Sequence, residues 1–299
     1  MQAVLRLFDN TTAKILCNIC ERVEIREIRL RVNRPICITT QNGKLYPTSS
    51  GGFTVSPVTN SLITTKDQIK SVVYNACDGS VYAYQNQINN GFITIKGGHR
   101  IGICGCAVYT NGEISNITNF SGLNIRIARQ FIGTAEKLFD VYKHLGLKNT
   151  LIVGAVGSGK TTVLRDISRS LATKYNICVI DERCEICNCV NGVPAFDIGT
   201  NCDCLNGYKK ADGIEIAIRT LSPDVIVFDE FSTQDELKSV NDCFNCGVNI
   251  IASIHAQNES DFMKKGITEY ILNQGLFDCF VFLQNCQISK IIIGDEGLC

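Results

Sequence analysis

The chain has 299 residues, of which 45% are hydrophobic and 19% are charged. This composition is typical of a globular protein and excludes a disordered or collagen-like chain, and the length leaves room for two domains. The longest apolar runs, such as residues 225–228, are of strand length, whereas a membrane-spanning helix needs about 20 apolar residues. The N-terminus lacks the basic and apolar layout of a secretory signal, so we expect a cytoplasmic protein.

The formal net charge is zero, but the two parts of the chain differ. Residues 1–133 carry 14 Lys and Arg against 7 Asp and Glu, a net charge of +7. Residues 134–299 therefore carry 15 against 22, a net charge of −7. We interpret the first part as a basic surface that faces phosphates, lipid headgroups or an acidic neighbour. The alternative is a chance distribution over a solvated surface.

Seventeen cysteines without an export signal indicate a reducing compartment, where thiols behave as small buried hydrophobes. Several cysteines are close together in the sequence, which leaves a zinc site as the alternative. These groups are Cys17 and Cys20; Cys184, Cys187 and Cys189; Cys202 and Cys204; and Cys243 and Cys246. A zinc ribbon needs two regular C-x-x-C knuckles, and the groups near residues 184 and 202 are irregular, so we favour free thiols.

The first third of the chain mixes strand and helix patterns. Residues 27–32 alternate apolar and charged side chains, and residues 35–38 and 44–46 continue this pattern on either side of an Asn42-Gly43 turn, which predicts a hairpin. Residues 66–77 place apolar side chains at helical spacing. Further strands are predicted at residues 92–95, 101–109 and 114–117. We therefore predict a small α+β domain over residues 1–133.

After Gly133 the pattern changes to buried strands that alternate with helices. An amphipathic helix is predicted over residues 134–145, and a second helix over residues 160–174. The strands, which are apolar throughout, are predicted at residues 150–153, 177–180, 225–228 and 249–253. Strands without a polar face are typical of a parallel sheet covered by helices on both sides. We predict an α/β domain of this kind over residues 134–299.

A phosphate-binding loop connects the first of these strands to its helix. The segment has the pattern G-x-x-x-x-G-K-T and consists of Gly154, Ala155, Val156, Gly157, Ser158, Gly159, Lys160, Thr161 and Thr162. Backbone N–H groups at such a turn surround phosphate oxygens, and the glycines allow close approach. Lys160 is expected to bind the β- and γ-phosphates and Thr161 to bind Mg²⁺. The sequence thus predicts an ATP and Mg²⁺ site.

Two carboxylates follow a later strand, at Asp229 and Glu230. An acidic pair at the end of a buried strand, about seventy residues after a P-loop, is typical of nucleotide hydrolysis. We expect Asp229 to face the magnesium ion and Glu230 to act on the attacking water as the general base.

A second acidic strand end, at residues 181–183, follows the P-loop helix and is expected to lie near the P-loop in the sheet. Glu182 is therefore a rival general base; the alternative is a surface loop in which Glu182 and Arg183 pair with each other. His255 ends the next strand and is placed either to sense the γ-phosphate or to serve as a satisfied core histidine.

Taken together, these motifs resemble the stage III sporulation protein AA family, which is itself similar to the hexameric ATPases of type II and type IV secretion systems. The resemblance spans most of the chain. In its second part it includes residues 154–165, 181–186, 210–213 and 218–224, and in its first part residues 27–32, 97–102 and 123–129. The chain departs from the family pattern at Asn201 and Cys202, at Tyr208 and Lys209, and at Cys184 and Cys204.

The resemblance implies a RecA-like ATPase that forms a hexamer and docks on integral membrane proteins, peripheral to the inner face of the mother-cell membrane. It also implies that Asp181 and Glu182 form an acidic box and His255 a histidine box. Arg126 or Arg129 would reach a nucleotide held by the ATPase domain, and Arg183 and Arg219 are further candidates for the catalytic site.

We therefore expect an ATP-hydrolysing motor of a membrane apparatus. Two alternatives stay open, because the same core serves several functions. One is a nucleic-acid-dependent ATPase of RecA type, and the other is a scaffold that binds ATP without turnover. Neutral net charge, the absence of tryptophan and the lack of a basic stretch interleaved with aromatic residues argue against a nucleic-acid partner.

Overall fold

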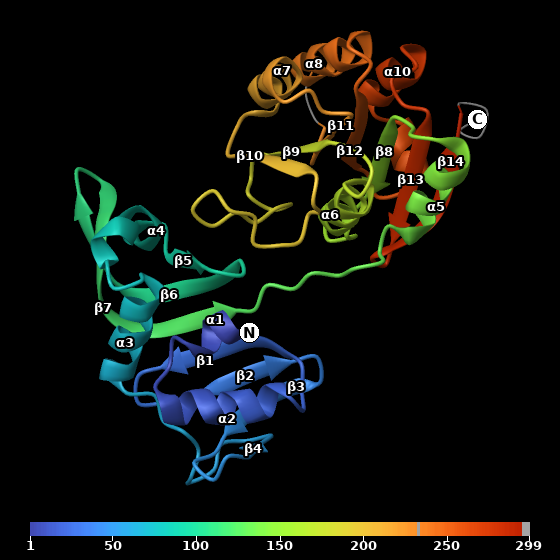
Figure 1. The fold of residues 1–299 in the computed structure, drawn as a ribbon. Coiled ribbons are helices and arrows are strands. Elements are labelled where there is room, and N and C mark those ends of the chain that lie inside the picture. Colours follow the sequence, from blue (N-terminus) through green and yellow to red (C-terminus); the bar gives the residue numbers. More distant parts are fainter. Residues whose placement is uncertain (232–233, 295–299) are drawn as a thin grey trace. The chain divides into compact units, whose positions relative to one another are not determined.

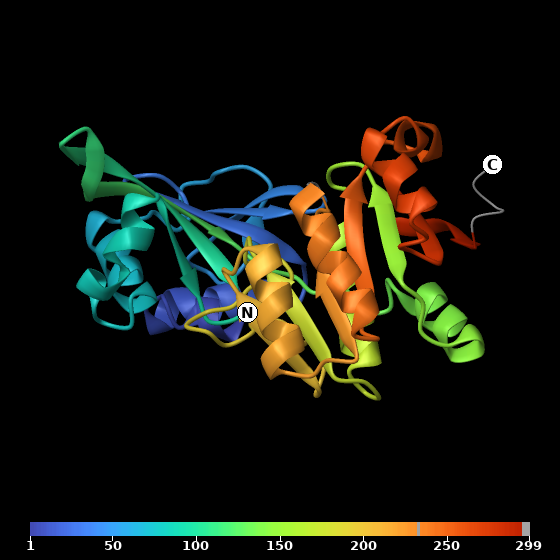
Figure 2. The ribbon, with the colours of Figure 1, turned by 90° about the horizontal axis from the view of Figure 1, so that it is seen from above.

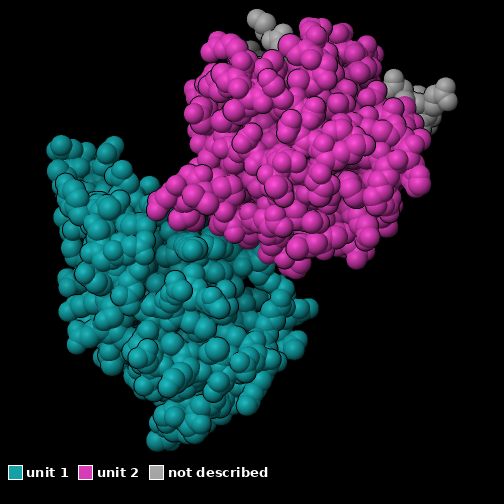
Figure 3. Space-filling model, viewed as in Figure 1, with its two compact units in different colours: residues 1–129 teal, residues 130–299 magenta. Residues whose placement is uncertain are grey.

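The computed structural model describes residues 1–231 and 234–294, and it divides into unit 1, Met1–Arg129, and unit 2, Gln130–Cys299. Figure 3 colours the two units. Each unit has a sheet and a hydrophobic core of its own. Among the described residues, no helix has both the length and the apolar character needed to cross a membrane.

Unit 1 contains an antiparallel sheet in the order β4-β3-β2-β1-β7-β6-β5 (Figure 1). Its strands are β1 (Ile25–Arg31), β2 (Cys37–Thr40), β3 (Gly43–Pro47), β4 (Phe53–Thr54), β5 (Phe92–Ile95), β6 (His99–Thr110) and β7 (Glu113–Arg126). The predicted hairpin is formed by β2 and β3. β6 and β7 are longer than the periodicity indicated, because β7 pairs with β1 on one side and β6 on the other.

Helices pack against the sheet of unit 1 and close its core. They are α1 (Gln2–Leu5), α2 (Asn10–Cys20), α3 (Lys66–Ala76) and α4 (Gln85–Asn89), with a 3-10 turn, η1, at Val81–Tyr84. α2 begins where the Asp9 carboxylate accepts hydrogen bonds from the backbone N–H groups of Thr11 and Thr12, both 3.0 Å long. Its buried Ile15, Leu16 and Ile19 join the core.

Unit 2 contains a mostly parallel sheet in the order β10-β9-β11-β12-β8-β13-β14. Its strands are β8 (Thr150–Gly154), β9 (Ile177–Asp181), β10 (Cys202–Asn206), β11 (Val225–Phe228), β12 (Asn249–His255), β13 (Cys279–Gln284) and β14 (Gln287–Ile293). The last strand, β14, pairs antiparallel with β13, so the expectation of a parallel sheet holds for the other strands only. An antiparallel edge strand on a parallel sheet is common in α/β folds.

Helices cover both faces of this second sheet. They are α5 (Glu136–Leu145), α6 (Lys160–Leu171), α7 (Lys210–Thr220), α8 (Gln234–Asn245), α9 (Glu259–Met263) and α10 (Gly266–Asn273). Residues of α7 to α10 belong to one hydrophobic core, and residues of α5 and α6 belong to the other. Alternate side chains of the same strands contribute to the two cores. α7 and α8 lie side by side (Figure 2). The chain is thus α/β with an antiparallel N-terminal sheet and a mostly parallel second sheet.

Candidate nucleotide site

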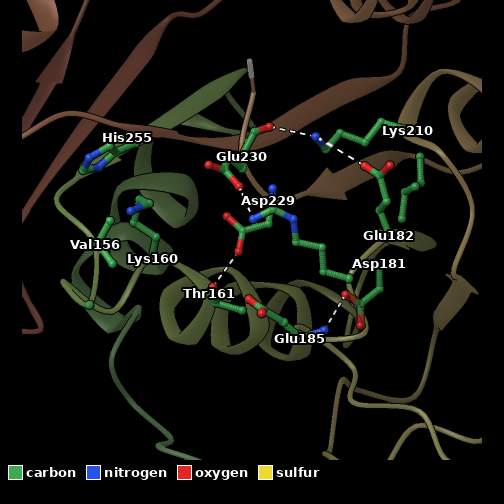
Figure 4. A pocket seen from close by; sticks show the side chains of 13 residues that line it. Val156, Lys160, Thr161, Asp181, Glu182, Glu185, Lys210, Asp229, Glu230 and His255 are labelled. Carbon is green, nitrogen blue, oxygen red and sulfur yellow. Dashed lines mark hydrogen bonds and ion pairs between the residues drawn. The ribbon is translucent and has the colours of Figure 1, made fainter. Parts of the chain in front are cut away.

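The predicted site residues of unit 2, apart from Arg219, gather where four parallel strands end. In open α/β sheets, ligands bind beyond the carboxyl ends of the strands. Here the loops after β8, β9 and β11 and the end of β12 line one pocket (Figure 4). Its lining residues are Val156, Gly157, Lys160, Thr161, Ile180, Asp181, Glu182, Arg183, Glu185, Lys210, Asp229, Glu230 and His255.

The P-loop joins β8 to α6 and leaves its lysine directed back at the loop. Gly157 and Gly159 have φ angles of 75° and 92°, which only glycine adopts readily. The Lys160 ammonium donates to the carbonyl oxygens of Gly154 and Ala155, at 2.8 and 2.9 Å. Burial lowers the pKa of Lys160, and the nearby carboxylates of β11's end oppose this effect.

Two further observations indicate that the loop fits a phosphate group. The Ser158 hydroxyl is buried and has no hydrogen-bond partner among the residues that the structure describes. A Cβ added at Gly157 would meet no atom within 4 Å, so nothing fills the space beside its backbone. Free space beside the backbone and an unpaired hydroxyl are what an anion cradle requires.

Thr161 and Asp229, the two residues predicted to bind magnesium, contact each other. The Thr161 hydroxyl donates to Oδ2 of Asp229 at 2.5 Å. The buried Ser253 hydroxyl, on β12, donates to Oδ1 of the same carboxylate and accepts the Glu230 N–H at 3.0 Å. A hydroxyl and a carboxylate are ligands that Mg²⁺ prefers, so this pair fits the ion.

Glu230 is held in a left-handed backbone conformation, with a φ angle of 55°. Its carbonyl oxygen accepts a hydrogen bond from Lys210 at 2.9 Å, and its carboxylate pairs with Arg183 at 2.5 Å (Figure 4). Lys210 is a pocket residue that sequence reasoning missed as a site residue, although its segment belongs to the family resemblance. It begins α7, and nothing in the local pattern signals that its ammonium returns to the end of β11.

Glu182 and Arg183 do not pair with each other, contrary to one alternative drawn from the sequence. Glu182 pairs with Lys210 at 3.4 Å, and Arg183 with Glu230. Both candidate bases therefore lie in the same pocket. The strand that precedes Glu182 is not next to the P-loop strand, because β11 and β12 lie between β9 and β8.

Asp181, the residue before Glu182, is turned into its own loop. It is 2% exposed, and its carboxylate accepts three backbone N–H groups, from Glu185, Ile186 and Cys187, at 2.8, 3.1 and 2.8 Å. Its hydrogen bonds shape the loop that follows β9. The sequence pattern offered no sign of this role.

His255 and the arginine candidates differ in where they lie. His255 lines the pocket, with Nδ1 3.3 Å from the carbonyl oxygen of Gly154. Arg219 lies on an exposed part of α7, pairs with Glu215 at 3.1 Å and does not line the pocket. Arg126 and Arg129 belong to unit 1, where they pair with Glu27 and Glu24.

Two solved structures with a similar fold are a pilus motor and an ATPase. The pilus retraction motor PilT with bound ADP superimposes with a TM-score of 0.60 at 14% identity, covering 94% of this chain and 82% of that one. The ATPase DotB of Legionella pneumophila gives a TM-score of 0.52 at 12% identity, covering 91% and 74%. Identities this low show that the fold is shared and nothing beyond it.

Sequence comparison identifies closer relatives. The protein SEEDLING PLASTID DEVELOPMENT 1 of Arabidopsis thaliana is 29% identical over 179 residues, 58% of this chain and 24% of that protein. The stage III sporulation protein AA of Bacillus subtilis is 31% identical over 271 residues, 89% of this chain and 84% of that protein. The family model for sporulation stage III, protein AA matches residues 1–294, and the chain belongs to this family.

Proposed function

We propose that the chain is an ATPase that uses Mg²⁺ to hydrolyse ATP at the pocket of unit 2. The contact between Thr161 and Asp229 carries this proposal, because it joins the P-loop helix to the strand end that holds Glu230. Such an arrangement of P-loop, hydroxyl and strand-end carboxylate is the one that phosphoryl transfer uses.

Each residue has a distinct part in the proposed reaction. The backbone N–H groups of the P-loop and the Lys160 ammonium bind the phosphates, and Thr161 and Asp229 hold the metal. Mg²⁺, when bound, neutralises charge on the phosphate oxygens. Glu230 accepts a proton from the attacking water once its carboxylate leaves Arg183, and Glu182 is the rival base. His255 contacts the γ-phosphate side of the loop.

The ATPase belongs, in this proposal, to a motor that assembles or drives a channel during sporulation. Family membership and the secretion-ATPase fold support a hexamer that docks on integral membrane proteins, on the inner face of the membrane in the mother cell. The N-terminal arginines Arg126 and Arg129, together with Arg219, are proposed to complete the site of a neighbouring subunit. The net charge of +7 over residues 1–133 supports this role for the N-terminal part.

Turnover of ATP by the full chain tests the proposal. Wild type is expected to release phosphate, and Glu230→Gln to lose about 10²- to 10⁴-fold in kcat while it retains ATP binding. If Glu230 is the general base, kcat should fall less in Glu182→Gln than in Glu230→Gln. If Glu182 is the base, kcat should fall more in Glu182→Gln. Glu269→Gln is the matched control, because Glu269 is exposed on α10 and outside the pocket.

Two outcomes contradict the proposal. Wild type that binds ATP without releasing phosphate is a scaffold rather than an enzyme. Strong stimulation by single-stranded DNA or RNA that disappears at high salt favours a nucleic-acid motor. The assembly part is tested by light scattering: ATP should enlarge the wild-type particle but not that of Lys160→Ala, and equal particles refute a role for phosphate contacts in assembly.

A further inference from the structure

Two cysteine side chains, Cys187 and Cys204, meet beside the carboxylate of Asp181, and a third, Cys189, contacts Cys204. The sulfur atoms of Cys189 and Cys204 are 3.5 Å apart. A carboxylate oxygen of Asp181 and the sulfurs of Cys187 and Cys204 all lie within 4.8 Å of one another. Cys204 comes from β10, whereas Cys187 and Cys189 come from the loop after β9.

The loop that carries two of these thiols is held at several points. Asp181 accepts the N–H of Cys187, and the carbonyl oxygen of Cys187 accepts the N–H of Ala195 at 3.1 Å. The buried Arg165 guanidinium, on α6, donates to the carbonyl oxygen of Ile186 at 2.5 Å. The Cys187 side chain, which is fully buried, therefore has a fixed position before anything binds to it.

We propose that Cys187, Cys189 and Cys204 bind a zinc ion as thiolates, with the Asp181 carboxylate as the fourth donor. Zinc prefers four ligands in a tetrahedron with Zn–S bonds of about 2.3 Å, which places neighbouring sulfurs about 3.8 Å apart. The observed separation of 3.5 Å between Cys189 and Cys204 is close to that value. The carboxylate has the capacity to join, because Oδ2 accepts a single N–H, that of Cys187, from the loop.

A buried cation lies beside the cluster. Zinc binding releases one proton from each thiol, three in total, and leaves the ion surrounded by three thiolates and a carboxylate. The Arg165 guanidinium, which interacts electrostatically with both Cys187 and Asp181, offsets part of this negative charge.

Two buried thiols of unit 2, Cys178 and Cys279, lie outside this cluster. Cys178 on β9 packs into the opposite core, and burial raises its pKa to about 12. Burial likewise raises the pKa of Cys279 to about 11. These are thiols that behave as small hydrophobes. The irregular spacing that argued against zinc in the sequence follows from the ligands' origin, because a strand and a separate loop supply them rather than two knuckles.

Cobalt binding to the full chain tests the site. In metal-free reducing buffer, wild type is expected to take up one Co²⁺ per chain, with the strong visible absorption of tetrahedral thiolate cobalt, and Zn²⁺ should displace it. Cys187→Ala, Cys189→Ala and Cys204→Ala should each weaken binding by more than about 100-fold, beyond what loss of an outer-shell partner causes. Cys178→Ala is the matched control and should bind as wild type does.

A second measurement needs no variant. Zn²⁺ should protect three thiols of the wild-type chain from alkylation, and mass spectrometry should assign them to Cys187, Cys189 and Cys204.

Lys160→Ala should bind cobalt as wild type does, so the cobalt result is independent of the proposed ATPase.

Three outcomes overturn the proposal. The first is wild type with reduced thiols that takes up no stoichiometric metal. The second is a disulfide between Cys189 and Cys204 in protein purified without added oxidant. The third is a control variant, Cys178→Ala, that loses as much metal as Cys204→Ala.

Discussion

Replacing Lys210 by methionine removes a charge on which three groups depend. The Lys210 side chain is 10% exposed. Its ammonium donates to the carbonyl oxygen of Glu230 and to a carboxylate oxygen of Glu236, both at 2.9 Å, and lies 3.4 Å from Glu182. Methionine keeps most of the volume of the side chain but none of these interactions. The substitution should therefore lower both the stability of unit 2 and its turnover.

The exposure of each partner sets the size of the effect. Removing the ammonium from a buried acceptor loses a hydrogen bond to a charged group, which contributes about 1.5–3 kcal/mol. The Glu236 side chain is 11% exposed and falls in this class, whereas Glu182 is 38% exposed and adds little because water screens it. We expect a loss of about 3 kcal/mol, or roughly 6–12 °C in Tm for a domain of this size.

Differential scanning calorimetry of the full chain measures this loss. Lys209→Met is the matched control, because the neighbouring Lys209 is exposed, and its Tm should stay within about 2 °C of wild type. Lys210→Arg keeps the charge and should recover most of the stability. The backbone of Glu230 loses its anchor, so kcat should fall as well. A Tm for Lys210→Met equal to that of the control would refute the assignment of Lys210 as the residue that holds these carboxylates.

Three further substitutions test other parts of the chain. Ser253→Ala removes the hydroxyl that donates a hydrogen bond to the carboxylate of Asp229. A hydrogen bond to a charged group contributes about 1.5–3 kcal/mol, so kcat should fall roughly 10- to 100-fold. Unchanged turnover across a Mg²⁺ titration would contradict this. Burial lowers the pKa of His99 from 6.5 to about 4. Between these pH values the unfolded chain binds a proton at His99 that the folded chain does not bind. The free energy of unfolding should therefore fall by about 3 kcal/mol as the pH drops from 6.5 to 4. Urea unfolding of wild type and His99→Gln at pH 7 and pH 4.5 checks this, and equal pH slopes in the two proteins would exclude His99 as the cause. Gly213→Ala would bring a Cβ 2.7 Å from a methyl carbon of Ile180 and should destabilise the chain by about 1–3 kcal/mol. In the control, Gly266→Ala, the added Cβ meets no atom within 4 Å and should be tolerated. Equal Tm values for the two variants would disprove the close packing of α7 on β9.

The fold was predictable where one local pattern decides the structure. The apolar run Val225–Phe228 and the helical spacing within Lys66–Ala76 give elements with nearly the predicted bounds. Helix α2 was missed although its signals are present: Asp9 is a good N-cap, and Ile15, Leu16 and Ile19 share one face. The second half of β7 was missed for a different reason. Its polar residues form a strand because β1 and β6 pair with it on either side, and sequence periodicity does not report such pairing.

The pocket was predictable only where its residues belong to short local motifs. The P-loop and the strand-end pair Asp229 and Glu230 each form a short local motif, and the structure brings them together. The ion pairs of Lys210 and Arg183 depend on how the loops return to the strand ends. Sequence spacing carries no information about that path.

The hydrogen bonds of Arg165 give the P-loop helix a second attachment. α6 begins at Lys160, and the guanidinium of Arg165, about one and a half turns later, donates to the carbonyl oxygens of Glu185 and Ile186 in the loop after β9. The same guanidinium lies 4.0 Å from the ring centre of Phe196, farther along that loop. Helix α6 and the loop after β9 are therefore joined through this side chain, so Arg165→Ala should separate two segments that now hold each other in place.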